Sequence, residues 1–196
     1  MTAVFNFDAN ILLWIQANLR GGLDGFFTFI THLGDKGLLW IALTLILMFP
    51  RKTRRAGVAS AIAMVLGLIV TNLILKNLVD KHRPYELING LTLMIEKQPD
   101  SSFPSGHATN SMACSWVLFR TLKKRYSVIA LILALLICFS RLYVGVHYPT
   151  DVLAGIAIGI CAAEFAIALV KTLKRRFPAF RRFINPKLKQ RDRVSR

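Results

Sequence analysis

Cysteine and acidic residues are scarce in this sequence, and no internal repeat or low-complexity segment stands out. The three cysteines all lie within apolar runs, so neither a disulfide framework nor a metal site built on cysteine spacing is expected. Ten Asp and Glu stand against 26 Lys and Arg, and no group of carboxylates resembles a Mg²⁺ site. The first nineteen residues contain no Lys or Arg, so a cleavable signal peptide is not expected. We therefore predict no metal or other cofactor.

The composition combines strong hydrophobicity with a large positive charge. The chain of 196 residues is 54% hydrophobic and has a mean hydropathy of +0.48, yet its formal net charge is +16. Because the basic residues are clustered rather than spread evenly, this composition favours a polytopic membrane protein over a soluble nucleic-acid binder. The length predicts a single integral-membrane domain over residues 1–196.

The apolar segments predict an all-α membrane helix bundle with about six transmembrane helices. Within residues 1–33, Gly21 and Gly22 separate two short apolar pieces. These are either an interfacial helix followed by a helix that enters the membrane, or one interrupted first span. A polar segment over 80–103, which contains two prolines, is expected to be a loop. The remaining spans are expected at 37–49, 56–79, 105–122, 127–144 and from 149 to about 170.

The basic clusters predict the orientation. Four Lys or Arg lie in 51–55, four in 120–125 and eleven from residue 171 onward, which together are 19 of the 26. An even number of crossings separates the first cluster from the last, so all three lie on one side. By the positive-inside rule that side is the cytoplasm, and 171–196 is a basic cytoplasmic tail. The loop 80–103 and the turn 144–149 are then extracytoplasmic.

Two clusters of polar residues are predicted to meet at this extracytoplasmic face. Lys76 and Arg83 are seven residues apart, and Pro84 disfavours helical geometry at Arg83, which places it just past a helix end. These two cations either bind an anion or extend toward lipid head groups. The second cluster, PSGH at 104–107, opens a span. Free N–H groups at a helix start bind anions, Ser105 adds a hydroxyl, and Gly106 permits close approach of a ligand.

The third cluster is SRLYVGVHYPTD at 140–151. Arg141 and Asp151 each border an apolar run, where an ionisable side chain usually serves a site. Pro149 suits the first turn of a helix, so Asp151 lies in that turn with its carboxylate free to reach back toward His147. A carboxylate beside a histidine fixes its tautomer and raises the basicity of the other ring nitrogen. The alternative is a capping Asp, an interfacial His and an Arg directed to lipid.

Together the three clusters suit a phosphoryl group. Three cations and a helix start supply donors for its oxygens, one histidine attacks phosphorus, and the other protonates the departing oxygen. The cations would take the place of a metal ion. A non-enzymatic carrier of a phosphorylated ligand would use the same cations but would not need the activated pair His147 and Asp151.

The sequence Lys76-x6-Arg83-Pro84, then PSGH, then Ser140-Arg141-x5-His147-x3-Asp151 is similar to the three-part signature of the type 2 phosphatidic acid phosphatase superfamily. Its integral-membrane branch includes undecaprenyl-diphosphate and phosphatidylglycerophosphate phosphatases. The resemblance implies that His147 is the nucleophile and forms a phosphohistidine, that Asp151 activates it, and that His107 is the general acid. It assigns phosphate binding to Lys76, Arg83, Ser105, Gly106 and Arg141, and implies an all-α bundle that needs no metal.

We therefore predict a hydrolase of a lipid phosphate or diphosphate, working at the extracytoplasmic surface of the inner (plasma) membrane. Undecaprenyl diphosphate is the first choice, because that carrier is released on the side that the site faces. Phosphatidylglycerophosphate or phosphatidate is the close alternative, and a phosphotransferase that passes the group to another lipid shares every motif. The partners expected are the lipid substrate and the membrane, with no nucleic acid; the oligomeric state is left open.

Overall fold

The computed structural model describes residues 3–184, and that part of the chain is helical with no strand. The helices in chain order are α1 (Ala3–Leu19), α2 (Asp24–Leu33), η1 (Asp35–Gly37), α3 (Leu38–Met48), α4 (Arg54–Leu68), η2 (Ile69–Leu75), α5 (Lys76–Val79), α6 (Pro84–Leu87), α7 (Gly106–Thr121), α8 (Lys124–Tyr143), α9 (Pro149–Arg176) and α10 (Pro178–Ile184).

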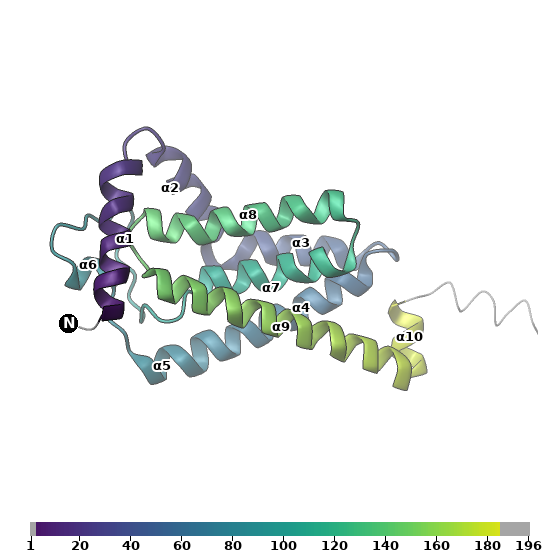
Figure 1. Cartoon of the computed structure of the whole chain (residues 1–196). Coiled ribbons are helices and arrows are strands. Elements are labelled where there is room, and N and C mark those ends of the chain that lie inside the picture. The colour runs from purple at the N-terminus through teal and green to yellow at the C-terminus, as the bar shows by residue number, and fades with distance from the viewer. Residues whose placement is uncertain (1–2, 185–196) are drawn as a thin grey trace, which may run out of the picture.

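The N-terminal region forms two separate helices within the described residues, α1 and α2, with a break at Gly21 and Gly22. Gly21 adopts φ +118° and ends the first helix, so α1 lies across one end of the bundle while α2 turns toward the bundle axis (Figure 1). Asp8 of α1 is buried and binds the start of α9: its carboxylate accepts hydrogen bonds from the backbone N–H of Thr150 at 3.2 Å and from its hydroxyl at 2.5 Å. Thus α1 secures the segment just after the turn 144–149.

Several helices are long and apolar enough to cross a membrane. Among the described residues these are Arg54–Leu87, α8 and α9, and the pair α2 and α3, bent by 43°, forms a fourth candidate. The predicted membrane helix bundle is confirmed. At 1.5 Å per residue, the 28 residues of α9 span ~42 Å, which exceeds the ~30 Å hydrocarbon core. Its basic last turn therefore extends beyond the core. The rest of the predicted tail, 185–196, lies outside the described residues.

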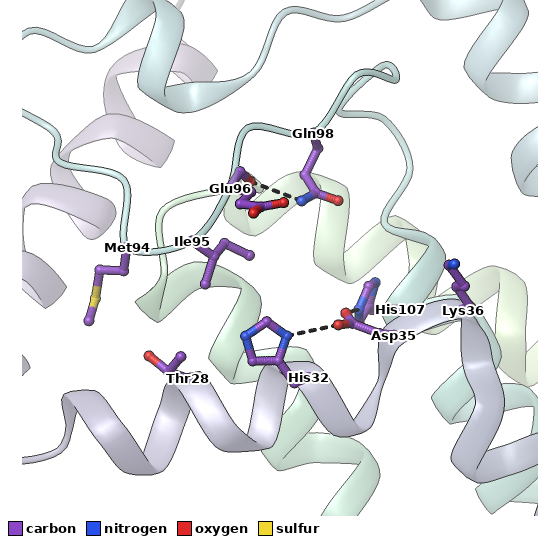
Figure 2. Close-up of a pocket in the computed structure, with 9 residues that line it drawn as sticks. All are labelled: Thr28, His32, Asp35, Lys36, Met94, Ile95, Glu96, Gln98 and His107. Atoms are coloured by element: carbon purple, nitrogen blue, oxygen red, sulfur yellow. Dashed lines mark hydrogen bonds and ion pairs between the residues drawn. The ribbon is translucent and has the colours of Figure 1, made fainter.

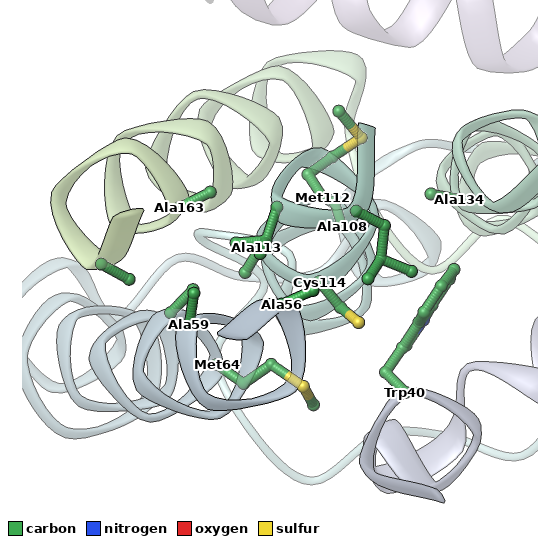
Figure 3. Close-up of a cluster of buried hydrophobic side chains, with 14 of the residues drawn as sticks. Trp40, Ala56, Ala59, Met64, Ala108, Met112, Ala113, Cys114, Ala134 and Ala163 are labelled. Carbon is green, nitrogen blue, oxygen red and sulfur yellow. The ribbon is translucent and has the colours of Figure 1, made fainter. Parts of the chain in front are cut away.

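The central helix of the bundle is α7, which packs against α4, α8 and α9. Small residues allow this: a Cβ added to Gly155 would lie 2.6 Å from the Ser105 carbonyl, and one added to Gly159 would lie 2.6 Å from the Thr109 carbonyl. Figure 3 shows the alanines of α4, α7 and α9 meeting beside Trp40 and Met64. Because little side chain separates the backbones, the start of α7 has a fixed position against α9.

The two ends of the bundle differ in character (Figure 1). The turn between α3 and α4, the turn between α7 and α8, and the end of α9 lie together at one end. At the other end α1, α6, the loop 88–105 and the turn 144–148 gather around the start of α7. The first end carries the predicted basic clusters, and the second carries all three polar motifs.

Candidate active site

A cavity of about 180 Å³ lies at the loop-rich end of the bundle. Six of the eight predicted site residues line it: Lys76, Arg83, Gly106, His107, Arg141 and His147. The walls also contain five polar or charged residues that the motifs do not include, namely Lys36, Asn72, Gln98, Asp100 and Asn110. Segments far apart in the sequence therefore converge on one small, polar space.

The first motif reaches the cavity through a change in helix type. The π-helical segment η2 precedes Lys76, α5 ends three residues later, and Asp80 adopts φ +40°. Arg83 is extended and buried, just past the helix end as predicted, and Pro84 begins α6. Its guanidinium donates to the Val146 carbonyl at 2.9 Å and so contacts the turn that carries the third motif.

Asp100 holds both cations of the first motif. Arg83 Nη2 lies 2.6 Å from one Asp100 oxygen, and Lys76 Nζ pairs with the other. Burial raises the pKa of Asp100, but the ion pairs with Lys76 and Arg83 outweigh this effect and keep the pKa below its ordinary value. Both cations line the cavity, where they share one carboxylate.

His147 and Asp151 lie side by side, but without a hydrogen bond. Glycine at position 145, with φ +81°, turns the chain after α8, and α9 then begins at Pro149. The distance from His147 Nδ1 to the nearer Asp151 oxygen is 3.7 Å. That carboxylate accepts hydrogen bonds from Ser102 Oγ at 2.5 Å and from Lys81 Nζ at 2.6 Å. Asp151 is therefore oriented beside the imidazole by two residues outside the motifs.

Burial governs the charge state of His147. The side chain is 2% exposed, and burial lowers the pKa of its imidazole well below the ordinary value, with Asp151 opposing this shift and Arg141 adding to it. The neutral imidazole therefore predominates at pH 7, and this is the form that attacks an electrophile. Within the described chain, His147 Nδ1 and Arg141 Nε are buried without a hydrogen-bond partner. Arg141 is otherwise held by Nη1, which donates to Thr31 Oγ1 at 2.6 Å.

The start of α7 places its residues in different roles. Ser105 is fully buried, and its hydroxyl accepts from the backbone N–H of Ala108 at 3.4 Å as a helix cap. It does not line the cavity, and its predicted contact with phosphate stays a prediction. Gly106 lies against Asn72, and His107 projects to the cavity mouth with its side chain 17% exposed. His107 Nε2 lies 3.0 Å from an oxygen of Asp35.

A wider pocket of about 660 Å³ adjoins the cavity, and the two share Lys36, Gln98 and His107 (Figure 2). It is lined by Met94 and Ile95 from the loop after α6 and by polar residues of α2 and η1. The pair of pockets offers a polar cavity for a small anion and a partly apolar entrance beside it. Among residues 3–184 no group of three or more His, Cys, Asp or Glu could hold a metal ion.

The sequence motifs did not include four residues that organise the site: Asp35, Lys81, Asp100 and Ser102. Lys81 and Ser102 lie in the polar loop beside recognised motifs, so they could have been nominated as neighbours. Their pairing with Asp151, at sequence separations of 70 and 49 residues, depends on the fold. Asp35 lies in the short break between two apolar segments, where a lone carboxylate is a usable but weak signal.

A helical membrane bundle that ends in buried cations and two histidines is the architecture of a membrane phosphatase. Residues 56–175 match the PAP2 superfamily model, and the chain belongs to this superfamily, as its motifs predicted. It is therefore a membrane lipid phosphatase, a hydrolase of phosphate esters.

Two curated relatives match most of the chain. Undecaprenyl-diphosphatase of Sulfolobus acidocaldarius is 30% identical over 166 residues, which is 85% of this chain and 80% of the relative. Phosphatidylglycerophosphatase B of Bacillus subtilis is 32% identical over 174 residues, which is 81% of this chain and 79% of the relative. At these coverages, residues 76–151 of this chain, which contain the three motifs, fall within both aligned regions.

Two crystal structures share the fold. The transmembrane PAP2-type phosphatidylglycerolphosphate phosphatase of Bacillus subtilis superimposes with a TM-score of 0.73 at 28% identity, over 90% of each chain. Aquifex aeolicus LpxE gives a TM-score of 0.73 at 28% identity, over 81% of this chain and 93% of that one.

Proposed function

We propose that this protein hydrolyses undecaprenyl diphosphate at the extracytoplasmic membrane surface through a phosphohistidine at His147. One observation carries the chemistry: a buried imidazole, that of His147, lines a small cavity together with Lys76, Arg83 and Arg141. A carrier that only bound a phosphorylated ligand would need the cations. It would not need a histidine with a carboxylate oriented behind it.

The positions of the two histidines support the following reaction. His147 Nδ1 lies on the Asp151 side, which leaves Nε2 to attack phosphorus. As the bond from Nε2 to phosphorus forms, the bond from phosphorus to the leaving oxygen breaks, and that oxygen takes a proton from His107. Water then attacks the phosphohistidine and gives a proton back to His107, and the electron pair of the P–N bond returns to Nε2.

The three cations stabilise the charge on the equatorial oxygens of the phosphoryl group during both steps. We propose that they act in place of a divalent metal ion. Asp151 stabilises the positive charge that develops on His147, since Lys81 and Ser102 keep its carboxylate beside the ring. Gly106 and the start of α7 add backbone donors at the cavity wall.

The connected pockets support a diphosphate as substrate. A terminal phosphate in the cavity near His147 would leave the second phosphate between His107 and Lys36, which both pockets share. The prenyl chain would then leave past Met94 and Ile95 toward lipid. The undecaprenyl-diphosphatase relative supports the same choice. The similar match to phosphatidylglycerophosphatase B makes phosphatidylglycerophosphate the second candidate.

Phosphate release from a panel of purified lipids in detergent tests the substrate. We expect the highest kcat/KM with undecaprenyl diphosphate, and a clear preference for phosphatidylglycerophosphate or phosphatidate would contradict that choice. Adding a lipid alcohol as acceptor separates hydrolysis from phosphotransfer, because a transferase would form a new lipid phosphate.

The nucleophile is tested with His147→Ala. We expect phosphate release to fall at least about a thousandfold, because loss of a covalent nucleophile removes the first chemical step. The control is His82→Ala, an exposed histidine that pairs with Glu86 outside the cavity, and it should retain full activity. Acid-labile phosphate on the wild-type protein after a rapid quench identifies the intermediate. More than a tenth of wild-type activity in His147→Ala would contradict the assignment.

A further inference from the structure

We propose that Asp35 is a positioning residue for the general acid His107, and that His32 fixes Asp35 in this role. The inference rests on the proposed function of His107 and extends it to two residues outside the three motifs. The structure places a carboxylate and a second histidine behind the imidazole that must deliver a proton to the leaving oxygen.

Asp35 bridges the two histidines with separate oxygens (Figure 2). One oxygen lies 3.0 Å from His107 Nε2, and the other lies 2.8 Å from His32 Nδ1. A carboxylate held at both oxygens has a fixed orientation. Since Asp35 occupies Nε2 of His107, the Nδ1 atom is the one left to donate to the leaving group. His32 is 56% exposed, so this row of side chains runs from the cavity mouth to the open pocket.

The backbone around Asp35 is shaped for this contact. Asp35 lies at the bend between α2 and α3, followed by Lys36 at φ +52° and Gly37 at φ +68°. A residue other than glycine rarely adopts this left-handed conformation, and such residues cluster at functional sites. Gly34 brings the bend against the imidazole, because a Cβ there would lie 2.6 Å from His107 Cδ2.

The surrounding charge explains why His107 needs this partner. A general acid must carry its proton before the leaving group departs, so the imidazolium form has to be reached before that step. Cations that surround the phosphate oppose a further positive charge, while an adjacent carboxylate favours it. Asp100, a carboxylate in the same cavity, is already paired with two cations. The titratable and charged groups that face His107 or line its two pockets are Lys36, Lys76, Arg83, Arg141, His32, His147, Asp35, Glu96 and Asp100.

Asp35 acts through His107 and does not exchange a proton with the substrate. In the first step the Nδ1 proton of His107 moves to the leaving oxygen, and in the second step Nδ1 recovers a proton from water. The carboxylate stabilises the imidazolium before the first step and after the second. Its loss should therefore matter most where the leaving group needs a proton.

The test is Asp35→Asn, which keeps the size and one hydrogen-bond acceptor but removes the charge. Activity is measured on an alkyl lipid phosphate, whose leaving group is a poor one, and on an aryl phosphate with a leaving group of low pKa. We expect kcat to fall at least about tenfold on the alkyl substrate and by less than about twofold on the aryl substrate. The basic limb of the kcat profile on the alkyl substrate should move to lower pH, and Asp35→Glu should recover part of the loss.

A matched pair of variants tests His32. His32→Gln should produce a smaller loss with the same dependence on the leaving group, because it loosens Asp35 without removing it. His82→Gln should not change the activity on either substrate, although His82 is also an exposed histidine paired with a carboxylate, that of Glu86, 3.2 Å away. An effect of equal size in both variants would contradict the role of His32.

Three results would overturn the role of Asp35: unchanged kcat, an equal loss on both substrates, or an unmoved pH profile. Tungstate binding and the thermal midpoint in detergent show whether Asp35→Asn is folded. If it is not, Asp35→Glu and His32→Gln carry the same comparison. His107→Ala separates this inference from the proposed function. If His107→Ala loses activity equally on both substrates, the assignment of His107 as the general acid fails. If His107→Ala loses more activity on the alkyl substrate but the Asp35 variants do not, only the inference about Asp35 fails.

Discussion

At the scale of single residues, Asp100 and a phosphate group need the same donors. The side chain of Asp100 is 49% exposed, whereas Lys76 and Arg83, which it pairs with, are 11% and 3% exposed. If phosphate binds as proposed, it therefore replaces a protein carboxylate on two buried cations. The carboxylate keeps these cations paired when no substrate is bound, and it competes with the substrate at the same time.

This competition predicts that Asp100→Asn binds oxyanions more tightly. Removing the negative charge frees Lys76 and Arg83, so the inhibition constant of tungstate should fall by severalfold. The measurement is inhibition of phosphate release at several tungstate concentrations, with a thermal melt to confirm that the variant is folded. Weaker inhibition than in the wild type would mean that Asp100 arranges the cations rather than competing for them.

The motifs predicted most of the residues that line the cavity, but only some of the hydrogen bonds and ion pairs between them. Five of the cavity residues could be identified because each is an ionisable residue at the edge of an apolar run, and their spacing is typical of a site that binds and transfers phosphate. These residues are Lys76, Arg83, His107, Arg141 and His147. The predicted approach of Asp151 to His147 is present at 3.7 Å, but the hydrogen bonds of that carboxylate go to Lys81 and Ser102. The hydrogen-bond partners of a carboxylate depend on the geometry of the surrounding loops, and the spacing of residues in the sequence does not specify that geometry.

At the scale of helices, the contact between α7 and α9 determines where His107 lies relative to His147. Gly159→Ala should lower the free energy of unfolding by about 1–3 kcal/mol, since the added methyl group overpacks a closed interface. Its Cβ would lie 2.6 Å from the Thr109 carbonyl and 2.9 Å from the Ala113 nitrogen. The thermal midpoint in detergent measures the effect.

Gly25→Ala is the matched control, because a Cβ at that helical position meets nothing within 4 Å. It should leave the midpoint unchanged or raise it slightly, since alanine favours helix. Equal midpoints for the Gly25 and Gly159 variants would show that α7 and α9 have room to separate.

The longer helices could be predicted because each apolar run is bounded by charge, glycine or proline, whereas α6 lies in the segment 80–103 that is expected to be a loop. The spans expected at 105–122 and 127–144 agree with α7 and α8 within a few residues. The sequence predicts that the last span ends at about residue 170, but α9 continues to 176, since the basic residues of its last turn are good helix formers outside the hydrocarbon core. The π-helical segment η2 and the bend at Asp35 depend on packing against α7, and no periodicity in the sequence indicates them.

At the scale of the whole molecule, the separation of charge between the two ends predicts the orientation. A single cysteine in place of Asn89, in a background without Cys114, Cys138 and Cys161, should react with a membrane-impermeant maleimide in intact cells. One in place of Lys52 should react only after lysis, because it lies in the turn between α3 and α4 at the basic end. Both positions are exposed, so accessibility is matched.

The reverse labelling pattern would place the cavity on the cytoplasmic side. The phosphatase chemistry would be unaffected, but recycling of a carrier lipid on the outer surface would no longer be its function.

The bond between Asp8 and Thr150 has a consequence for how the enzyme is made. It joins positions 142 residues apart, so α1 cannot secure the turn that carries His147 until the ribosome has produced the chain through Thr150. A nascent chain that stops after α8 already contains the cations and His107, yet it lacks both His147, the proposed nucleophile, and the helix α9 that follows it. On the proposed mechanism, interrupted synthesis therefore leaves an inert fragment in the bilayer, and hydrolysis of membrane lipids begins only when α9 has been inserted.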